Sequence, residues 1–244
     1  MDAVYNRYEQ KYILTKAQRD ILEGVLLEHL SYDLYSAPGK PYVIRNIYYD
    51  TDDHAVIRHS VQKPVYKEKL RLRCYADPVT DDDTVYLEIK KKFKGRVNKR
   101  RLPMTYGDAR QMMESGLVPD GDNQVQREIA YMIRSTDIRP GAVIRYRRTA
   151  FVSQDQSLRV TFDEDIMFYS QESVRASKDG GFLPVLDNPD LVLLEIKSVT
   201  NFPLWLVRAL STFPLFSRSF SKYGSAYRTY IAGGMIDDPI PDQP

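Results

Sequence analysis

Hydrophobic and polar residues alternate along much of the chain, which is the pattern of half-buried β-strands. Residues 69–74 (KLRLRC) and 85–90 (VYLEIK) show it clearly, because Leu, Ile, Val or Cys occupies every second position and a polar or charged residue the positions between. Similar runs recur from one end of the chain to the other. Strands are predicted over residues 4–13, 42–50, 64–75, 84–92, 96–103, 143–152, 157–163 and 191–199.

Helical spacing is confined to shorter stretches. Thr15, with Gln18 three positions later, forms a capping-box pattern at the start of one helix, and Pro203 suits the start of another. Helices are predicted over residues 16–30, 106–115, 124–134, 204–213 and 220–231. The expected fold class is α+β, a mostly antiparallel sheet of about eight strands with helices packed outside. We expect one domain over residues 1–236 and a disordered tail over residues 237–244, which are rich in Pro and Asp.

Composition narrows the class of protein. The chain has 244 residues, of which 43% are hydrophobic and 28% charged, as in a globular protein with a sizeable core. A single cysteine, Cys74, excludes an internal disulfide framework and a cysteine-based zinc site. No apolar run reaches the ~18 residues of a membrane-spanning helix, and no signal peptide is evident, so a cytoplasmic location is expected. No P-loop, dinucleotide fingerprint, HExxH or GxSxG motif occurs in the sequence.

Charge is unevenly placed although the total is nearly balanced. Lys and Arg number 35 against 33 Asp and Glu, a formal net charge of +2. Because successive side chains of a strand point to opposite faces, the polar faces of five predicted strands collect ten cations against four acids, a net of +6. The cations are Arg7, Lys11, Lys67, Lys69, Arg71, Arg73, Lys90, Lys92, Arg159 and Lys197, and the acids are Glu9, Glu88, Asp163 and Glu195.

This concentration of cations has two interpretations. A sheet with one solvated face and no function would explain any single strand. Like charges on adjacent strands repel, however, so agreement in sign across several strands favours an anionic ligand that neutralises them. The planar fork of Arg matches phosphate oxygens. If the sheet closes into a barrel, these faces would line a tunnel that attracts polyanions, and the carboxylates among the cations would suit a divalent metal bound together with phosphates.

Eight short motifs carry a resemblance to a known family. They are RYEQKY (7–12), YYDT (48–51), KLRLRCY (69–75), YLEIKKK (86–92), RTAF (148–151), LRVTFD (158–163), LLEIK (193–197) and FSKY (220–223). In this order they resemble the VTC domain, the catalytic domain of the vacuolar transporter chaperone polyphosphate polymerases, within the CYTH/triphosphate tunnel metalloenzyme superfamily. The resemblance extends over about residues 5–231 and implies an eight-stranded antiparallel β-barrel tunnel with a basic lining.

The resemblance also implies roles for individual residues. The implied catalytic residues are Lys11, Arg71, Arg73, Lys90, Arg148, Arg159, Lys197 and Lys222. The implied substrate-binding residues are Lys69, Lys92, Arg7 and Tyr86, and the implied ligands of Mg²⁺ or Mn²⁺ are Glu195, Glu9 and Glu88. Alternation does not orient residues 143–150, and the resemblance favours Arg148 inward. Two alternatives stay open: Asp163 could pair with Arg159 instead of contacting metal, and Glu9 and Glu88 could orient neighbouring cations.

The activity implied is that of a polyphosphate polymerase, which transfers the terminal phosphate of ATP to a growing polyphosphate chain. Such transfer depends on positioning and charge neutralisation, so no nucleophilic side chain is needed. The CYTH hydrolases begin ExExK, whereas this chain has Arg7, Glu9 and Lys11 in the pattern RxExK, which favours the polymerase branch.

The competing predictions are a metal-dependent triphosphate hydrolase and a non-catalytic polyphosphate-binding module. The expected partners are ATP and a polyphosphate or inorganic phosphate acceptor. Nucleic acid is not expected, because no recognition motif accompanies the aromatic residues that could stack on bases, such as Tyr66. A membrane partner protein is left open.

Overall fold

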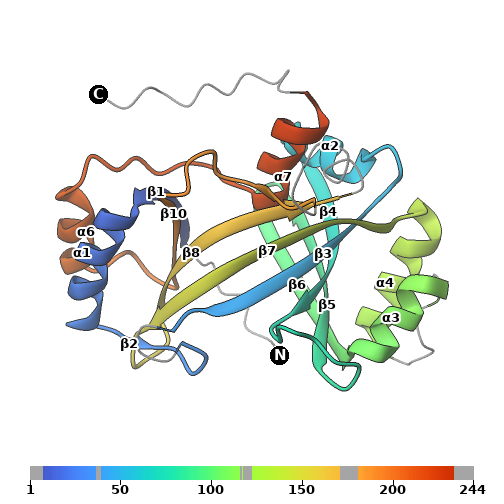
Figure 1. The fold of residues 1–244 in the computed structure, drawn as a ribbon, viewed down its shortest axis with the longest axis horizontal. Helices are drawn as coiled ribbons and strands as arrows, with labels where there is room; N and C mark the ends of the chain where they lie inside the picture. Colours follow the sequence, from blue (N-terminus) through green and yellow to red (C-terminus); the bar gives the residue numbers. More distant parts are fainter. Residues whose placement is uncertain (1–7, 37–39, 116, 118–122, 171–180, 234–244) are drawn as a thin grey trace. The chain divides into compact units, whose positions relative to one another are not determined.

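The structure, a computed structural model, describes residues 8–36, 40–115, 117, 123–170 and 181–233 (Figure 1). The strands are β1 (Tyr8–Thr15), β2 (Ser31–Tyr32), β3 (Tyr42–Asp50), β4 (Tyr66–Cys74), β5 (Thr84–Phe93), β6 (Arg96–Thr105), β7 (Arg139–Val152), β8 (Leu158–Tyr169), β9 (Leu183–Pro184) and β10 (Leu191–Ser198). The helices are α1 (Lys16–Leu27), α2 (Ala55–Val61), α3 (Tyr106–Ser115), α4 (Gln124–Thr136), α6 (Leu204–Ser211), α7 (Lys222–Ala226) and the π-helical turn η1 (Tyr227–Ile231).

The ten strands form an antiparallel sheet, which confirms the predicted fold class. Their hydrogen-bonded order is β1-β10-β8-β7-β3-β4-β5-β6, with β2 beside β7 and β9 beside β8. Among the described residues β1 and β6 stand at the two ends of this order, so the pairing is not that of the closed eight-stranded barrel that was expected. The count differs because β2 and β9, of two residues each, are too short to leave an alternating pattern.

The chain divides into two compact units. Unit 1 consists of residues 1–44, 145–166 and 186–220, and unit 2 of residues 45–144, 167–185 and 221–244. Strands β3, β7 and β8 have residues in both units. The expectation of one domain over residues 1–236 stays a prediction, and the predicted tail, residues 237–244, lies outside the described residues. No helix in the described part of the chain has the length and apolar character needed to cross a membrane.

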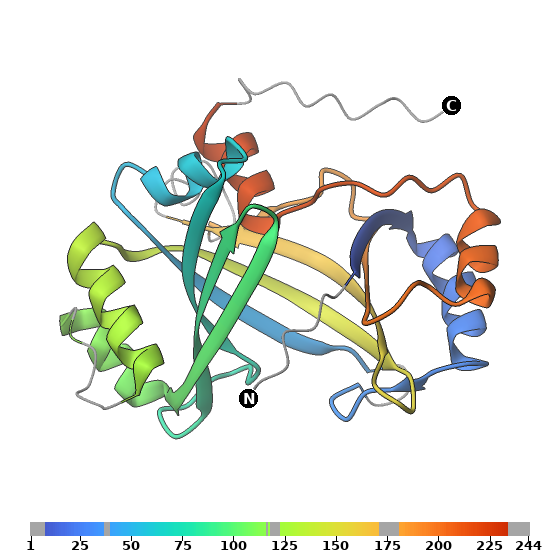
Figure 2. The ribbon, with the colours of Figure 1, turned by 180° about the vertical axis from the view of Figure 1, so that it is seen from behind.

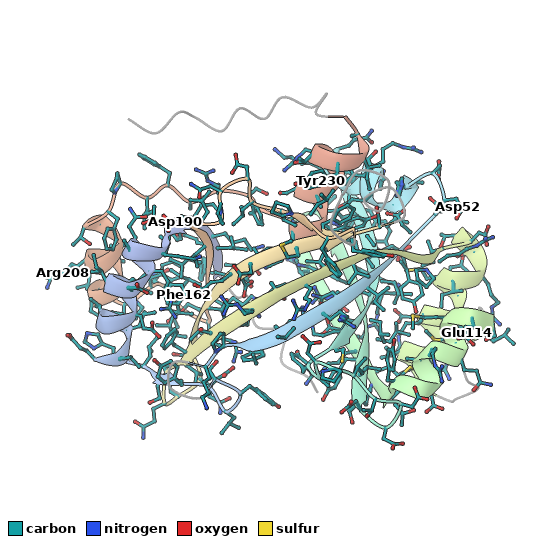
Figure 3. The ribbon with its side chains drawn as sticks, viewed as in Figure 1. Asp52, Glu114, Phe162, Asp190, Arg208 and Tyr230 are labelled. Atoms are coloured by element: carbon teal, nitrogen blue, oxygen red, sulfur yellow. The ribbon has the colours of Figure 1, made fainter. Side chains whose placement is uncertain are left out.

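Unit 1 packs α1 and α6 side by side over β1, β10 and β8 (Figures 1 and 2). The capping box predicted for α1 is present: the Thr15 hydroxyl accepts from the Gln18 amide at 3.2 Å, and the Gln18 side chain accepts from the Thr15 amide at 2.9 Å. Leu22 of α1 and Leu206 of α6 lie in a core with Phe162, whose side chain is labelled in Figure 3. One face of these strands is thus apolar, which leaves their other face to charged residues.

Unit 2 is organised in the same way around β4, β5 and β6. Strands β5 and β6 form a hairpin whose turn places Lys94 at φ 46° and Gly95 at φ 83°, and Figure 2 shows the two strands side by side. Helices α3 and α4 cover the apolar face, where Leu70, Leu87 and Met132 are buried in a second core. The opposite face of the three strands carries the charged residues.

Candidate anion-binding site

Cross-strand register gathers most of the predicted cations of unit 2 on one face of β4, β5 and β6. Pairing across β4 and β5 aligns Lys67 with Lys92, Lys69 with Lys90, Arg71 with Glu88 and Arg73 with Tyr86. Pairing across β5 and β6 then adds Lys99 opposite Lys90 and Arg101 opposite Glu88. These residues are called the basic face below. Alternation along the sequence predicted the β4 and β5 parts of it correctly.

A buried carboxylate lies at the centre of the basic face. Glu88 is only 1% exposed, and its two oxygens accept from Arg71 Nε at 2.7 Å and from Lys99 Nζ at 2.6 Å. Burial alone would raise the pKa of Glu88, but Arg71, Arg73 and Lys99 hold it at about 2. Both oxygens are therefore committed to cations. This geometry suits the orienting role for Glu88 better than the role of metal ligand.

Asn46 and Tyr48, both on β3, fix the two arginines further. The Asn46 side chain, which is 1% exposed, accepts from Arg73 Nε at 2.9 Å and donates to the carbonyl of Ile144 at 3.3 Å. The Tyr48 hydroxyl accepts from Arg71 Nη1 at 3.1 Å. Each guanidinium thus has a fixed plane, which is what bidentate recognition of a phosphate requires.

The surroundings of two lysines of the basic face disfavour their charged forms. Burial first, and then the nearby Lys67 and Lys90, lower the pKa of Lys69 to about 8. Burial and Arg71 lower the pKa of Lys99 to about 8, despite its ion pair with Glu88. Tyr48 and Asp50 act in the opposite direction on the pKa of Lys69, but they do not offset burial and the two lysines. An anion bound there would relieve this repulsion.

Unit 1 holds a second charged group, the carboxylate–lysine cluster of Glu9, Lys11, Glu195 and Lys197. Register places Lys11 opposite Glu195 and Glu9 opposite Lys197. Lys11 Nζ lies 2.9 Å from Glu9 Oε1, 3.8 Å from Glu195 Oε2 and 3.1 Å from the carbonyl of Phe220, and Lys197 pairs with Glu195. Burial and Glu195 act to raise the pKa of Glu9, but Lys11 and Lys197 leave it below the ordinary value.

This cluster fits a divalent cation in part. Glu9 and Glu195 are two carboxylates close enough to affect each other electrostatically, and oxygen donors of this kind suit Mg²⁺ or Mn²⁺, which take further oxygens from water and phosphate. Within the described residues no three His, Cys, Asp or Glu side chains gather as a metal-binding set. The protein would therefore supply two carboxylates, and Glu88 of unit 2 would not be one of them.

Two further arginines of unit 1 are tied to carboxylates. Arg148 is buried, and its Nε and Nη2 donate to the two oxygens of Asp163 at 2.6 and 2.8 Å. Burial works against the charged guanidinium, but Asp163 raises the pKa of Arg148 well above its usual range. Arg159 instead donates to Asp33 at 2.6 Å. The suggested pairing of Asp163 with Arg159 is therefore wrong, because Asp163 accepts from Arg148 and Arg159 donates to Asp33.

Two other predicted site residues, Arg7 and Lys222, belong to neither of these charged groups. Arg7 lies outside the described residues, and Lys222 is the first residue of α7 in unit 2, half-buried. Sequence reasoning missed Lys99 and Arg101, although Gly95 marks a tight turn from which the β5–β6 register could have been counted. It also missed Asn46, Tyr48 and Asp33, which reach their arginines from distant parts of the chain and leave no local signal.

Comparison with known proteins agrees with this architecture. A solved structure of a candidate adenylate cyclase from Bacillus halodurans matches with a TM-score of 0.52 at 15% identity, covering 87% of this chain and 92% of that one. The PH1819 protein of Pyrococcus horikoshii matches with a TM-score of 0.35 at 11% identity, covering 84% of this chain and 85% of the other, and this weaker likeness carries no argument. No curated protein sequence matches the chain.

The family itself is decided by the sequence. The likeness to the Bacillus halodurans structure concerns the fold alone, because the two sequences share only 15% identity. The model of the VTC domain, in contrast, matches residues 6–231, nearly the whole chain, and it includes all the strands that carry the basic face and the carboxylate–lysine cluster. The chain therefore belongs to the VTC domain family.

Proposed function

We propose that this protein is an ATP-dependent polyphosphate polymerase that uses Mg²⁺ or Mn²⁺. Membership of the VTC domain family supports the broader class, an enzyme that binds and processes polyphosphate or triphosphate. The basic face supports the anionic substrate, and the carboxylate–lysine cluster supports the metal. The finer claim, polymer synthesis from ATP, rests on the RxExK pattern of Arg7, Glu9 and Lys11.

The observation that carries the proposal is that Lys69 lies half-buried next to other lysines. Its neighbours across and along the strands are Lys90 and Lys67, and burial with their repulsion lowers its pKa to about 8. The favourable effects of Tyr48 and Asp50 do not offset this, and an apolar residue at position 69 would remove the repulsion. Sites that oppose stability in this way are characteristic of function, and condensed phosphate is the ligand that neutralises several adjacent cations at once.

In the proposed reaction the bond between the β and γ phosphates of ATP breaks. A new bond forms between that γ phosphorus and a terminal oxygen of the acceptor phosphate, so ADP leaves and the chain grows by one phosphate. Arg71 and Arg73, with planes fixed by Glu88 and Asn46, would orient phosphate oxygens, and Lys69 and Lys90 would neutralise their charge. The metal, held by Glu9 and Glu195, would supply further charge neutralisation.

The activity is tested by incubating the purified protein with ATP and Mn²⁺ and separating the products on a gel stained for polyphosphate. Polymer with release of ADP supports the proposal. Orthophosphate without polymer would identify a hydrolase, and binding of polyphosphate without turnover of ATP would identify a binding module. Either of these two results would overturn it.

Lys69→Met is the variant that tests the basic face. Loss of one charged contact to phosphate should weaken binding of tripolyphosphate about tenfold or more, since hydrogen bonds to charged groups contribute about 1.5–3 kcal/mol, and polymer yield should fall with it. The melting temperature should stay the same or rise, because the repulsion is removed. Replacing Arg71 and Arg73 together is a poorer test, since it leaves the buried Glu88 with Lys99 alone.

Lys91→Met is the matched control. Lys91 is the next residue after Lys90, but it lies on the other face of β5 and pairs with Glu128 at 3.1 Å. We expect it to leave tripolyphosphate binding and polymer yield near those of the wild type. Equal losses in the two variants would show that only the overall charge matters, and would contradict a specific role for Lys69.

A further inference from the structure

Asp50 anchors α7 to β3 in unit 2. Its carboxylate is 1% exposed and accepts from the amides of Thr51 at 2.9 Å, Val56 at 2.8 Å and Ile57 at 3.1 Å. It also accepts from the hydroxyl of Tyr223, on α7, at 2.9 Å. A carboxylate held by this many donors is fixed in place, so it provides a rigid attachment for Tyr223.

Tyr223 in turn packs on Tyr48, the β3 residue that contacts Arg71 of the basic face. Its side chain is 2% exposed, and its ring stacks on that of Tyr48 with centroids 5.0 Å apart and planes inclined by 29°. Tyr48 is two residues before Asp50 on β3, so both contacts of Tyr223 fall on the same face of that strand. The stack restricts the position of the Tyr48 ring and of its hydroxyl.

The hydroxyl of Tyr48 contacts Arg71. It accepts from Arg71 Nη1 at 3.1 Å, and the guanidinium carbon lies 5.9 Å from the centre of the Tyr48 ring. Glu88 holds the Nε side of the same guanidinium. Arg71 is therefore oriented from two sides, by Glu88 on β5 and by Tyr48, and the second of these depends on Tyr223 and Asp50.

We propose that Tyr223, anchored by Asp50, is a positioning residue for Arg71. Neither Tyr223 nor Asp50 needs to touch phosphate for this role. They fix the Tyr48 ring so that the guanidinium of Arg71 meets phosphate oxygens in one orientation. The inference rests on the proposed function in that Arg71 binds condensed phosphate. It adds that α7, through Tyr223, helps to orient an arginine of the basic face.

A double-mutant cycle with inorganic tripolyphosphate as the probe tests this role without requiring any turnover. Tyr223→Leu removes the ring that supports Tyr48, and Arg71→Lys keeps a cation beside Glu88 but loses the bond to Tyr48. Each should weaken tripolyphosphate binding, measured by calorimetry, about fivefold or more, and the double variant should bind no more weakly than Arg71→Lys. Losses that multiply in the double variant would overturn the proposal.

Tyr230→Leu is the structural control. Tyr230 is less buried than Tyr223, but it also stacks on an aromatic ring, that of Phe168 at 6.0 Å, and donates to the carbonyl of Pro184 at 2.6 Å, so its loss likewise removes a ring contact and a hydrogen bond in unit 2. We expect a lower melting temperature with unchanged tripolyphosphate binding. An equal loss of binding in Tyr230→Leu would mean that the effect of Tyr223→Leu is only structural, and the proposal would fail.

Tyr48→Phe keeps the inference testable if Tyr223→Leu does not fold. It retains the stack on Tyr223 and removes the oxygen that accepts from Arg71. It should weaken tripolyphosphate binding in the wild-type background and have no further effect with Arg71→Lys. Wild-type affinity in Tyr48→Phe would overturn the role. Failure to make polymer from ATP, by contrast, would count against the proposed function alone.

Discussion

Lys69 and Lys99 lie in surroundings that favour their neutral forms, and this has opposite consequences for ligand binding and for stability. Burial and neighbouring cations lower both pKa values to about 8. A bound polyanion favours the protonated lysines, so binding at pH 8 should take up protons. In the unfolded chain the same lysines titrate near 10.4, so between about pH 8 and 10.4 the unfolded state holds more protons.

The pH dependence should therefore show two opposite trends. Affinity for tripolyphosphate should fall as pH rises from 7 to 9, as Lys69 and Lys99 lose their protons. The free energy of unfolding should rise over the window from about pH 8 to 10, because the unfolded state binds more protons there. Calorimetry and urea denaturation, each repeated with Lys69→Met, measure the contribution of Lys69. A wild type and a Lys69→Met variant with the same pH profile would show that Lys69 does not titrate in this range.

Single residues also show what alternation could and could not predict. It placed Arg71 and Arg73 on one face of β4 and Glu88 on the polar face of β5, and the cross-strand register brings these two faces to the same side. It did not predict that cations surround Glu88, because Lys99 lies on the next strand, β6. Only the register of the β5–β6 hairpin places Lys99 beside Glu88. The partner of Arg148 was likewise decided by three-dimensional proximity, which favoured Asp163.

At the scale of elements, the surroundings of two glycines predict that replacement by alanine will stabilise the protein at one position and destabilise it at the other. Gly24 lies within α1, and a Cβ there would meet nothing within 4 Å, so Gly24→Ala should stabilise the protein by about 0.5–1 kcal/mol. Gly141 lies on β7, where a Cβ would come within 3.2 Å of the Asp50 Cβ. Asp50 is held by its hydrogen bonds and cannot yield easily, so Gly141→Ala should destabilise by about 1–3 kcal/mol. Denaturation curves measure both, and a neutral Gly141→Ala would show that Asp50 can move.

The sequence predicted those elements whose own residues carry a signal, either alternating or helical spacing of apolar residues or a capping box. Strand β3 and helix α3 were predicted to the residue, and the capping box of α1 was visible in the sequence. Helix α2 was missed because its start depends on Asp50, whose carboxylate accepts from the amides of Val56 and Ile57. His54 before it adopts φ 58°, a conformation that no local signal indicated.

For the molecule as a whole, the division into two units was not visible in the sequence. A boundary is normally sought in a linker, but here β3, β7 and β8 have residues in both units, so the chain crosses between them without a break in pattern. Each unit has its own apolar core and its own charged group, the basic face in unit 2 and the carboxylate–lysine cluster in unit 1. The two groups differ in composition: the first has one carboxylate among many cations, the second as many carboxylates as lysines.

This difference predicts that the carboxylate–lysine cluster binds the metal and the basic face binds the phosphate chain, and two single variants can test the two roles separately. Glu195→Gln should raise the Mn²⁺ concentration needed for half-maximal activity about tenfold or more. Without metal it should leave tripolyphosphate affinity the same or higher, because it removes a negative charge beside Lys11 and Lys197. Lys69→Met should do the reverse, weakening tripolyphosphate binding with little change in the Mn²⁺ requirement, and the exposed Glu28→Gln should change neither. If Glu195→Gln and Lys69→Met shift both measurements alike, the metal and the phosphate chain are not held by separate groups.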